Sequence, residues 1–426
     1  MSFLEDMKSK KRIWLVFIPL MLFYASSYFQ RTAIPGTTYT IFQVDYGFSA
    51  AQIANLTASF VYIYAFCQLV VGMLADKYSG IRIVTVAGAI FCAGVAAFPL
   101  CGNNIHLLYA CRFLMGLGAS ALYLSLVKEA DRLFGRKNYS VMIGIIYFVG
   151  YGGGLFGTLP FGSLCRHYEL PFLLYWVAGI TLFLYLFFLA VRKNAPTAPI
   201  SPAKLSLKPL WKIVKKPYCW MLAFSSTVVF SFHSIGQMVF GKKFLQDSAG
   251  LSAAVAESTI FMQTFVCMCA LLSGGILTRL TRNKRKPLII FAPALTFLTA
   301  LMMLSAIYFH LPAYFYIAGM ILFSAASGFA VVYPMAIQEF NSRETITLAA
   351  GFINNCTYLG IAIFSPLAGM LLDCFIEPGS TIYPREAYLW LYGLGLIPAS
   401  MAVLFACIIP ETGGHFLQQS SSNPKP

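Results

Sequence analysis

The sequence predicts an all-α membrane protein of twelve transmembrane helices, arranged as two pseudo-symmetric bundles of six. Three observations support this fold class: the composition, the length of the apolar segments, and an internal repeat. Hydrophobic residues make up 59% of the 426 residues and charged residues only 11%, which is far more apolar than a soluble domain. Most of the chain is therefore expected to lie in lipid.

Twelve apolar segments are long enough to cross a bilayer, which takes about 20 residues of α-helix. Charged clusters, prolines and glycines separate one segment from the next. The segments lie at 13–39, 50–75, 82–101, 107–128, 139–163, 170–191, 217–241, 252–278, 287–309, 312–337, 346–372 and 387–409.

The basic residues predict the orientation, because Lys and Arg near helix ends are retained in the cytoplasm. With the N-terminus inside, most of the 30 lysines and arginines fall in cytoplasmic connections. Arg166, Lys242, Lys243 and Arg385 fall on the opposite side. We expect both termini in the cytoplasm. The short outer loops carry no N-x-S/T sequon, which favours a bacterial inner membrane.

An internal repeat predicts the two halves. The sequence Gly47-Phe-Ser-Ala-Ala-Gln follows the first segment, and Gly250-Leu-Ser-Ala-Ala-Val follows the seventh, 203 residues later. The same offset relates Gly72-Met-Leu to Gly275-Ile-Leu. A connection rich in Lys and Pro separates the halves and is expected to lie on the anionic inner leaflet. The predicted parts are an N-terminal half at 1–191, a basic linker at 192–216, a C-terminal half at 217–409 and a cytoplasmic tail at 410–426.

The composition also excludes several function classes. The net charge of +15 does not predict nucleic-acid binding, because the basic residues lie in short loops between apolar segments. The 11 cysteines lack C-x-x-C spacing, so we expect neither a metal site nor a cofactor. The sequence contains no G-x-x-x-x-G-K-[ST] phosphate loop and no catalytic cluster of His, Asp and Glu. We therefore expect no enzyme activity.

Two motifs resemble signatures of the major facilitator superfamily. Residues 72–82, Gly-Met-Leu-Ala-Asp-Lys-Tyr-Ser-Gly-Ile-Arg, are similar to its loop between the second and third helices, with one extra residue before the second glycine. Arg112, Gly116 and Gly118 are spaced as in its R-x-x-x-G-x-G motif. The resemblance covers the whole chain and implies a transporter that alternates access around a midplane site.

The loop at 72–82 is the predicted gating element. Its glycines relieve backbone crowding in a tight turn. Asp76 can accept hydrogen bonds from a neighbouring helix N-terminus or a basic side chain. Such a clasp would close the cytoplasmic side in one state and release it in another. The residues assigned to gating are Gly72, Asp76, Gly80, Arg82 and Arg112.

Glycines crowd the fifth segment, at 150, 152–154 and 157. Small residues allow helix backbones to approach closely within a membrane. We therefore predict a packing seam or a flexing element in this helix.

Ionisable residues inside membrane helices are costly unless they face a cavity or a partner, so they are the first candidates for binding. Arg31 can clamp a carboxylate or phosphate with two hydrogen bonds, or it can snorkel to the outer interface. The repeat offset relates Arg31 to Ser234, next to His233. Interhelical hydrogen bonding is the alternative for the polar candidates. The remaining predicted substrate-binding residues are Tyr28, Tyr62, Tyr64, His233, Gln237, Gln263, Asn354 and Asn355.

Two residues are candidates for proton coupling. Glu129 follows the fourth segment and is the best-placed carboxylate in the sequence, although mixed charges there are also typical of a solvated helix end. His233 is the second candidate because histidine titrates near neutral pH.

The predicted function is secondary active transport of a small polar or anionic metabolite, such as an amino acid or organic acid, coupled to a proton or counter-ion. Tyr28-x-x-Arg31 and glycines 152–154 resemble the organophosphate branch of the superfamily, which has a second arginine where this chain has His233 and Ser234. The chain also resembles amino-acid importers of bacteria that live inside host vacuoles. Phosphate or organophosphate antiport, export of drugs or metabolites, and solute sensing without transport are the alternatives.

Overall fold

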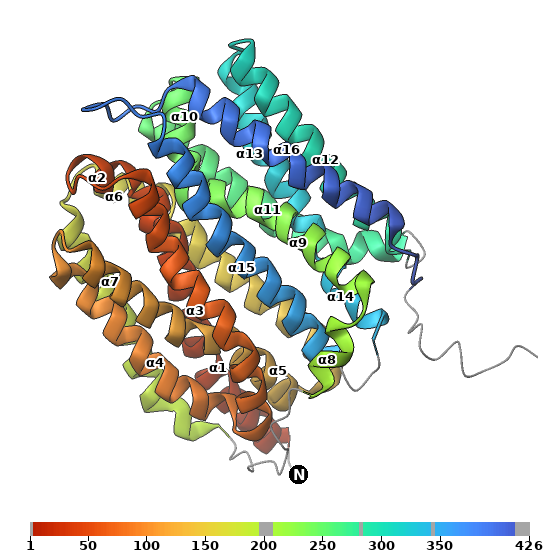
Figure 1. Cartoon of the computed structure of the whole chain (residues 1–426). Helices are drawn as coiled ribbons and strands as arrows, with labels where there is room; N and C mark the ends of the chain where they lie inside the picture. Colours follow the sequence, from red (N-terminus) through yellow and green to blue (C-terminus); the bar gives the residue numbers. More distant parts are fainter. Residues whose placement is uncertain (1–2, 196–207, 281–283, 342–345, 414–426) are drawn as a thin grey trace, which may run out of the picture. The chain divides into compact units, whose positions relative to one another are not determined.

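The computed structural model describes residues 3–195, 208–280, 284–341 and 346–413, and their regular structure is entirely helical (Figure 1). Within these helices, the side-chain surroundings of residues 3–11, 69, 72–73, 75–77, 136–141, 208–209, 274–280 and 346–347 lie outside the description. In the described residues, 12 helical spans are long and apolar enough to cross a membrane. The predicted fold class is confirmed.

The helices, with π and 3-10 turns labelled η, follow in chain order. They are α1 (Phe3–Thr32), η1 (Ala33–Thr37), α2 (Tyr39–Val44), α3 (Ala50–Lys77), α4 (Gly80–Ala97), η2 (Phe98–Cys101), α5 (Ile105–Phe156), α6 (Leu159–Cys165), α7 (Leu170–Val191), η3 (Arg192–Asn194), α8 (Lys208–Val214), α9 (Pro217–Ile235), η4 (Gly236–Phe240), α10 (Gly241–Ala249), α11 (Ala253–Leu280), α12 (Lys286–Tyr308), α13 (Ala313–Phe329), α14 (Val332–Glu339), α15 (Ile346–Asp373) and α16 (Arg385–Ile408).

Two spans differ from their predicted lengths. The fourth continues to Gly135, where a φ of 72° interrupts α5 before the fifth span begins. Glycine adopts this backbone conformation at little cost. The seventh runs from Pro217 to Ala249, because η4 and α10 extend it beyond the predicted end at 241.

Contacts divide the chain into two compact units. The first comprises Met1–Ala33 and Ser59–Leu205, and the second comprises Ile34–Ala58 and Ser206–Pro426. In the first unit, α1 and α4 each pack along α5 and α7. In the second, α9 packs along α15 and α16, while α12 packs along α13 and α16. This division differs from the predicted halves, because residues 34–58 pack with the C-terminal helices.

The repeat of 203 residues is visible in the helix boundaries. The irregular segments η1 and η4 begin at Ala33 and Gly236, and the helices α3 and α11 begin at Ala50 and Ala253. Ile34 within η1 has extended backbone angles (φ −124°, ψ 118°), so the first span is kinked there, whereas η4 is a π-helical turn. This kink differs from the unbroken helix predicted for the first span. Pro35 was the available signal for a break, because proline removes a backbone donor within a helix.

Glycines of α5 form a packing seam against α1. A Cβ atom on Gly153 would lie 2.1 Å from the carbonyl oxygen of Ala25, and one on Gly157 would lie 2.2 Å from Thr32 Oγ1. Thr32 Oγ1 also donates a hydrogen bond of 2.8 Å to the carbonyl oxygen of Gly154. Gly152 lies on another face of the helix, where a Cβ atom would meet nothing within 4 Å.

We expect Gly153→Ala to lower the free energy of unfolding by about 1–3 kcal/mol, as overpacking a close contact does. The new methyl group would meet backbone atoms of α1, which cannot rotate away. Gly152→Ala is the matched control, and its stability should be unchanged or slightly higher because alanine is the better helix former. Thermal unfolding in detergent compares the two variants. Equal melting temperatures would contradict the seam.

Candidate functional site

Arg31 and Arg112 form a buried cationic cluster in the first unit, with 2% and 1% of their surface exposed. Arg31 Cζ lies 4.2 Å from the ring centroid of Tyr64 and 4.8 Å from that of Tyr28. The Phe60 ring contacts both guanidinium groups, at 5.3 Å from Arg31 Cζ and 4.8 Å from Arg112 Cζ. Cation–π contacts of this kind stabilise charge away from water. Arg31 is thus held within aromatic rings, which disfavours snorkelling.

The Arg-x-x-x-Gly-x-Gly motif positions this cluster. A Cβ atom on Gly116 would lie 2.2 Å from the carbonyl oxygen of Phe60, and one on Gly118 would lie 2.4 Å from that of Ala87. The two glycines therefore let α5 pack directly on α3 and α4. One turn earlier, Arg112 Nη1 donates a hydrogen bond of 3.0 Å to the carbonyl oxygen of Gln30. Sequence reasoning assigned Arg112 to gating and missed its place beside Arg31.

The predicted tyrosine wall is only partly assembled around Arg31. Tyr64 is buried, whereas Tyr62 is 42% exposed. Residues two apart on a helix point about 200° away from each other, so these side chains serve different faces of α3. Tyr28 also packs against Tyr24 and Tyr151, with ring centroids 5.2 and 5.3 Å away. The surroundings of Arg31 are therefore rich in tyrosine even without Tyr62.

His233 is the centre of a polar cluster in the second unit. It is buried, and its Nδ1 lies 2.8 Å from Ser324 Oγ on α13. Gln263 Nε2 on α11 lies 3.2 Å from the same nitrogen and donates a hydrogen bond of 3.2 Å to the carbonyl oxygen of His233. Next to it, Gln237 Nε2 donates to Thr264 Oγ1 at 2.6 Å. The structure thus brings together three residues that the sequence had predicted separately.

Several polar atoms on these helices are buried and have no hydrogen-bond partner within the described part of the chain. They include Gln263 Oε1, Ser234 Oγ and Asn355 Oδ1. Buried polar atoms are usually paired, so these three are candidates to bind a polar ligand or water. Asn354 and Asn355 are half-buried on α15.

The two clusters occupy corresponding helices of the repeat: the first, second and fourth spans of one half, and the seventh, eighth and tenth of the other. Gln30 and His233 are related by the repeat offset, and each lies three residues before an irregular segment, η1 or η4. Both main-chain carbonyl oxygens accept a hydrogen bond from a buried side chain, that of Arg112 or Gln263. The repeat therefore relates the hydrogen bonds to these two carbonyl oxygens as well as the helix boundaries.

Glu129, a residue of α5, is buried against the first turn of α4. It accepts hydrogen bonds from the backbone nitrogen of Ile81 at 3.3 Å and from Arg132 Nε at 2.7 Å. A Cβ atom on Gly80 would lie 2.6 Å from the carbonyl oxygen of Ser125, so only glycine lets α4 begin this close to α5. Arg82 is exposed. Gly72 and Asp76 lie within α3, but their surroundings are outside the described side chains.

Carboxylates hold the corresponding end of the second unit. Glu411 accepts hydrogen bonds from the backbone nitrogens of Arg285 at 2.7 Å and Lys286 at 2.8 Å, where α12 begins. Glu339 pairs with Arg285, whose Nη2 lies 2.9 Å from Glu339 Oε1. Arg285 is the repeat equivalent of Arg82. These contacts of Glu411 and Glu339 at the start of α12 are called the Glu411 clasp below.

Two buried ion pairs in the second unit were missed by the sequence analysis. Lys242 Nζ lies 2.8 Å from Glu257 Oε1, and Lys243 Nζ lies 2.6 Å from Asp247 Oδ1. Asp247 also accepts a hydrogen bond of 3.0 Å from the hydroxyl of Tyr388. Glu257 lies inside the predicted helix 252–278, so a buried carboxylate other than Glu129 was recognisable. Asp247 was not, because the seventh helix was ended at 241.

Residues 34–58 contact η4, α10 and α15 of the second unit. A Cβ atom on Gly36 would lie 2.6 Å from the carbonyl oxygen of Gln237, so the η1 backbone lies directly on η4. Lys242 Nζ donates to the carbonyl oxygen of Thr37 at 2.9 Å. At the start of α3, both carboxylate oxygens of Asp373 accept hydrogen bonds, from the backbone nitrogens of Ala50 at 2.7 Å and Ala51 at 2.8 Å.

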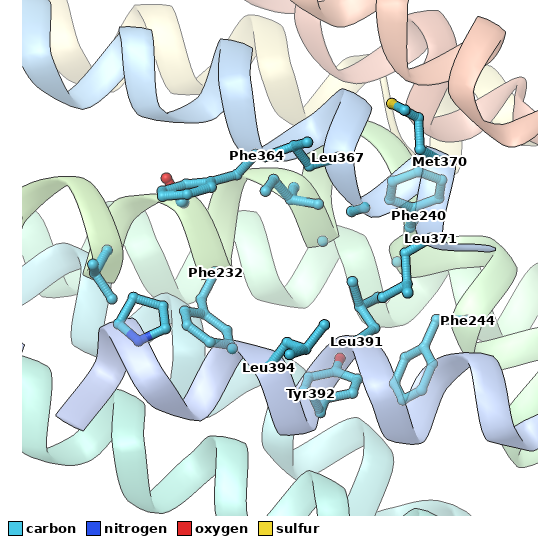
Figure 2. A pocket seen from close by; sticks show the side chains of 18 of the residues that line it. Phe232, Phe240, Phe244, Phe364, Leu367, Met370, Leu371, Leu391, Tyr392 and Leu394 are labelled. Atoms are coloured by element: carbon cyan, nitrogen blue, oxygen red, sulfur yellow. The ribbon is translucent and has the colours of Figure 1, made fainter. Parts of the chain in front are cut away.

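An apolar cavity of about 650 Å³ lies between α9, α15 and α16 (Figure 2). Residues 228, 231, 232 and 235 of α9 line it, whereas His233 lies on a different face of that helix. Several lining side chains, among them Leu367, Met370 and Ile397, are more than half exposed, so the cavity opens at the surface of the unit. Its hydrocarbon walls do not match a polar solute. They include Phe232, Phe240, Phe244, Phe364, Leu371, Leu391, Tyr392 and Leu394.

The spans, the repeat and the buried charges together describe a multi-pass integral membrane protein of the transporter class. Residues 20–365 match the family model for the Major Facilitator Superfamily. The chain belongs to this superfamily, and the resemblance read from the motifs is confirmed at that level.

Solved structures share the fold at low sequence identity. A bacterial homolog of the human lysosomal transporter Spinster is 15% identical with a TM-score of 0.75, over 96% of this chain and 98% of its own. The nucleoside transporter NupG gives 15% and 0.73, over 92% and 98%. A D-xylose-proton symporter gives 14% and 0.72, over 95% and 100%. The chain matches no curated protein sequence.

The Glu411 clasp predicts an acid-dependent loss of stability. Partial burial raises the pKa of this carboxyl, but hydrogen bonds from backbone N–H groups, including those of Arg285 and Gly413, outweigh that effect and lower the pKa overall. A glutamate whose pKa is lowered by folding stabilises the folded state at pH values above the ordinary glutamate pKa of about 4.3. That contribution disappears as the pH falls through the lowered pKa.

Glu411→Gln should therefore cost about 1 kcal/mol near neutral pH, the size of a helix N-cap. The difference from the unmodified protein should shrink as the pH falls below about 4.3 and vanish below the lowered pKa of Glu411. Thermal unfolding in detergent across this pH range measures the effect. The exposed Glu377 provides a control, since Glu377→Gln should change stability little at any pH. A difference for Glu411→Gln that persists at acidic pH would exclude the clasp.

Proposed function

We propose that this protein is a proton-coupled secondary transporter that moves a small anionic or polar metabolite, such as an amino acid or organic acid, by alternating access. We further propose that it lies in a bacterial inner membrane with both termini in the cytoplasm, as the basic residues predict. The anionic substrate class is proposed from one observation: the buried arginines Arg31 and Arg112 contact the same phenyl ring.

Two like charges buried in a low-dielectric span are costly, and an anion bound between or beside them offsets that cost. Guanidinium groups suit carboxylate and phosphate, because their donors match two oxygens at once. The tyrosines around Arg31 supply apolar rings with polar tips, which accommodate the rest of a small metabolite. Arg31 is thus the proposed anion-binding residue, with Tyr28 and Tyr64 as walls.

The polar cluster in the second unit is proposed to hold the coupling proton and to offer further contacts for the substrate. His233 is hydrogen-bonded through Nδ1 to two side chains, and a change in its protonation would rearrange both contacts. Glu129, by contrast, is already fixed by Arg132 and by the start of α4. We therefore assign the coupling role to His233 before Glu129.

Gating is proposed to involve contacts at both ends of the membrane spans. The contacts of Gly80 and Glu129 hold the start of α4, at the predicted cytoplasmic end. The contacts of Gly36 and Asp373 hold residues 34–58 at the predicted outer end. Alternating access requires that contacts of this kind form and break in turn.

Uptake into liposomes by the purified protein, against a panel of carboxylates, phosphates and neutral solutes, tests the proposal. For the transported anion, Arg31→Gln should weaken binding by about ten- to a hundredfold, because it removes a charge-assisted contact of about 1.5–3 kcal/mol. Arg31→Lys keeps the charge but not the two-point geometry, so it should rescue binding only in part. Unchanged affinity in Arg31→Gln would remove the residue from the site.

His233→Gln tests the coupling role separately from binding. We expect the pH dependence of net uptake to flatten, because glutamine cannot carry the proton, while counterflow exchange stays largely intact. Both are measured with the same proteoliposomes. An unaltered pH dependence would move the coupling role to Glu129 or Glu257.

Exchange of phosphate or organophosphate is the second candidate, favoured by the presence of two arginines in one cluster. An antiporter of this kind would take up labelled phosphate only when phosphate or an organophosphate is present inside the liposome. Uptake driven by a proton gradient into phosphate-free liposomes would decide against it.

A further inference from the structure

Two cysteines meet in the hairpin that joins α4 to α5. Cys101 is the last residue of η2, and Cys111 lies in the second turn of α5. Their Sγ atoms are 3.5 Å apart. Cys101 is partly exposed, whereas Cys111 is buried with 6% of its surface exposed.

We propose that Cys101 and Cys111 are a redox modification site at which an intramolecular disulfide forms. The bond itself is about 2.0 Å long, so the two sulfur atoms need to approach by only about 1.5 Å. Cys101 can supply this movement, because it lies at the end of a short 3-10 turn and is followed by Gly102 with a φ of 53°.

Cys111, the second cysteine of the pair, is fixed in position. A Cβ atom on Gly94 would lie 2.9 Å from the carbonyl oxygen of Cys111, so α4 and α5 are in direct backbone contact at this level. Cys111 is therefore held in place while the exposed cysteine moves towards it. The bond would tie the end of α4 to the second turn of α5.

The predicted topology places this hairpin on the non-cytoplasmic side of the membrane, where disulfides form and persist. The inference therefore depends on the orientation of the chain in the cell, but not on the proposed substrate or coupling ion.

The chemistry needs an oxidant, and a soluble disulfide of the glutathione type is sufficient. The Cys101 thiol loses its proton to water, and the thiolate attacks one sulfur of that disulfide, releasing one small thiol. Cys111 then loses its proton and attacks the Cys101 sulfur of the mixed disulfide, releasing the second small thiol. Two protein thiols are oxidised, and the small disulfide is reduced to two thiols.

The test uses the full-length protein in detergent, treated with oxidised glutathione and then labelled with a maleimide after denaturation. Two fewer cysteines than the 11 in the chain should be labelled. Treatment with a reductant before labelling should restore all of them. Trypsin releases residues 83–112 as one peptide, which holds Cys92, Cys101 and Cys111. In the oxidised protein this peptide should carry a single label, on Cys92, and weigh two hydrogen atoms less than the same singly labelled peptide with two free thiols.

In Cys101→Ser, the peptide of residues 83–112 should carry two labels, on Cys92 and Cys111, because Cys111 has lost its disulfide partner. Cys374→Ser removes an exposed cysteine that is also predicted to lie on the outer side, and this variant should still lose two labels. Full labelling of the unmodified protein after oxidation would overturn the proposal. So would a glutathione adduct that stays on Cys101, or a loss of label mapped to other cysteines.

Discussion

Lipid offers a helix no hydrogen bonds, so the polar groups within the spans must find partners inside the protein or in a ligand. This constraint organises both units. Arg31 and Arg112 are surrounded by aromatic rings, and His233 is hydrogen-bonded to side chains of α11 and α13. Carboxylates that would be costly alone are paired with bases or with helix N-termini, as Glu257 and Asp373 are.

Close backbone approach makes this pairing possible. A guanidinium or imidazole reaches a neighbouring helix only if the two backbones are near, and glycines on α5 allow α1, α3 and α4 to come within such reach. The irregular segments η1 and η4 lie next to these polar contacts. Each follows a carbonyl oxygen that accepts a side-chain hydrogen bond, at Gln30 and at His233. Breaks in helix regularity and buried polar contacts therefore coincide in both halves of the repeat.

The polar cluster around His233 and the apolar cavity of the second unit lie on different faces of α9. One face of α9 carries His233 and contacts polar side chains, whereas the face with Phe232 lines hydrocarbon walls. Neighbouring residues on a helix thus serve different environments. The first face offers a polar substrate more hydrogen-bonding groups than the second, whose lining is mostly hydrocarbon.

The sequence by itself determined the class of fold, the number of spans and the 203-residue repeat, because hydrophobic length and periodicity are local properties of the chain. It also singled out Arg31, His233, Gln237 and Gln263 as polar residues in apolar helices. Only the tertiary structure decided which of these meet, for example that Gln263 reaches His233 while Tyr62 points away from Tyr64. It also decided that Arg112 lies beside Arg31 and that residues 34–58 pack with the C-terminal helices. Contacts between distant segments depend on how helices pack, and that information is not contained in the spacing of residues along one helix.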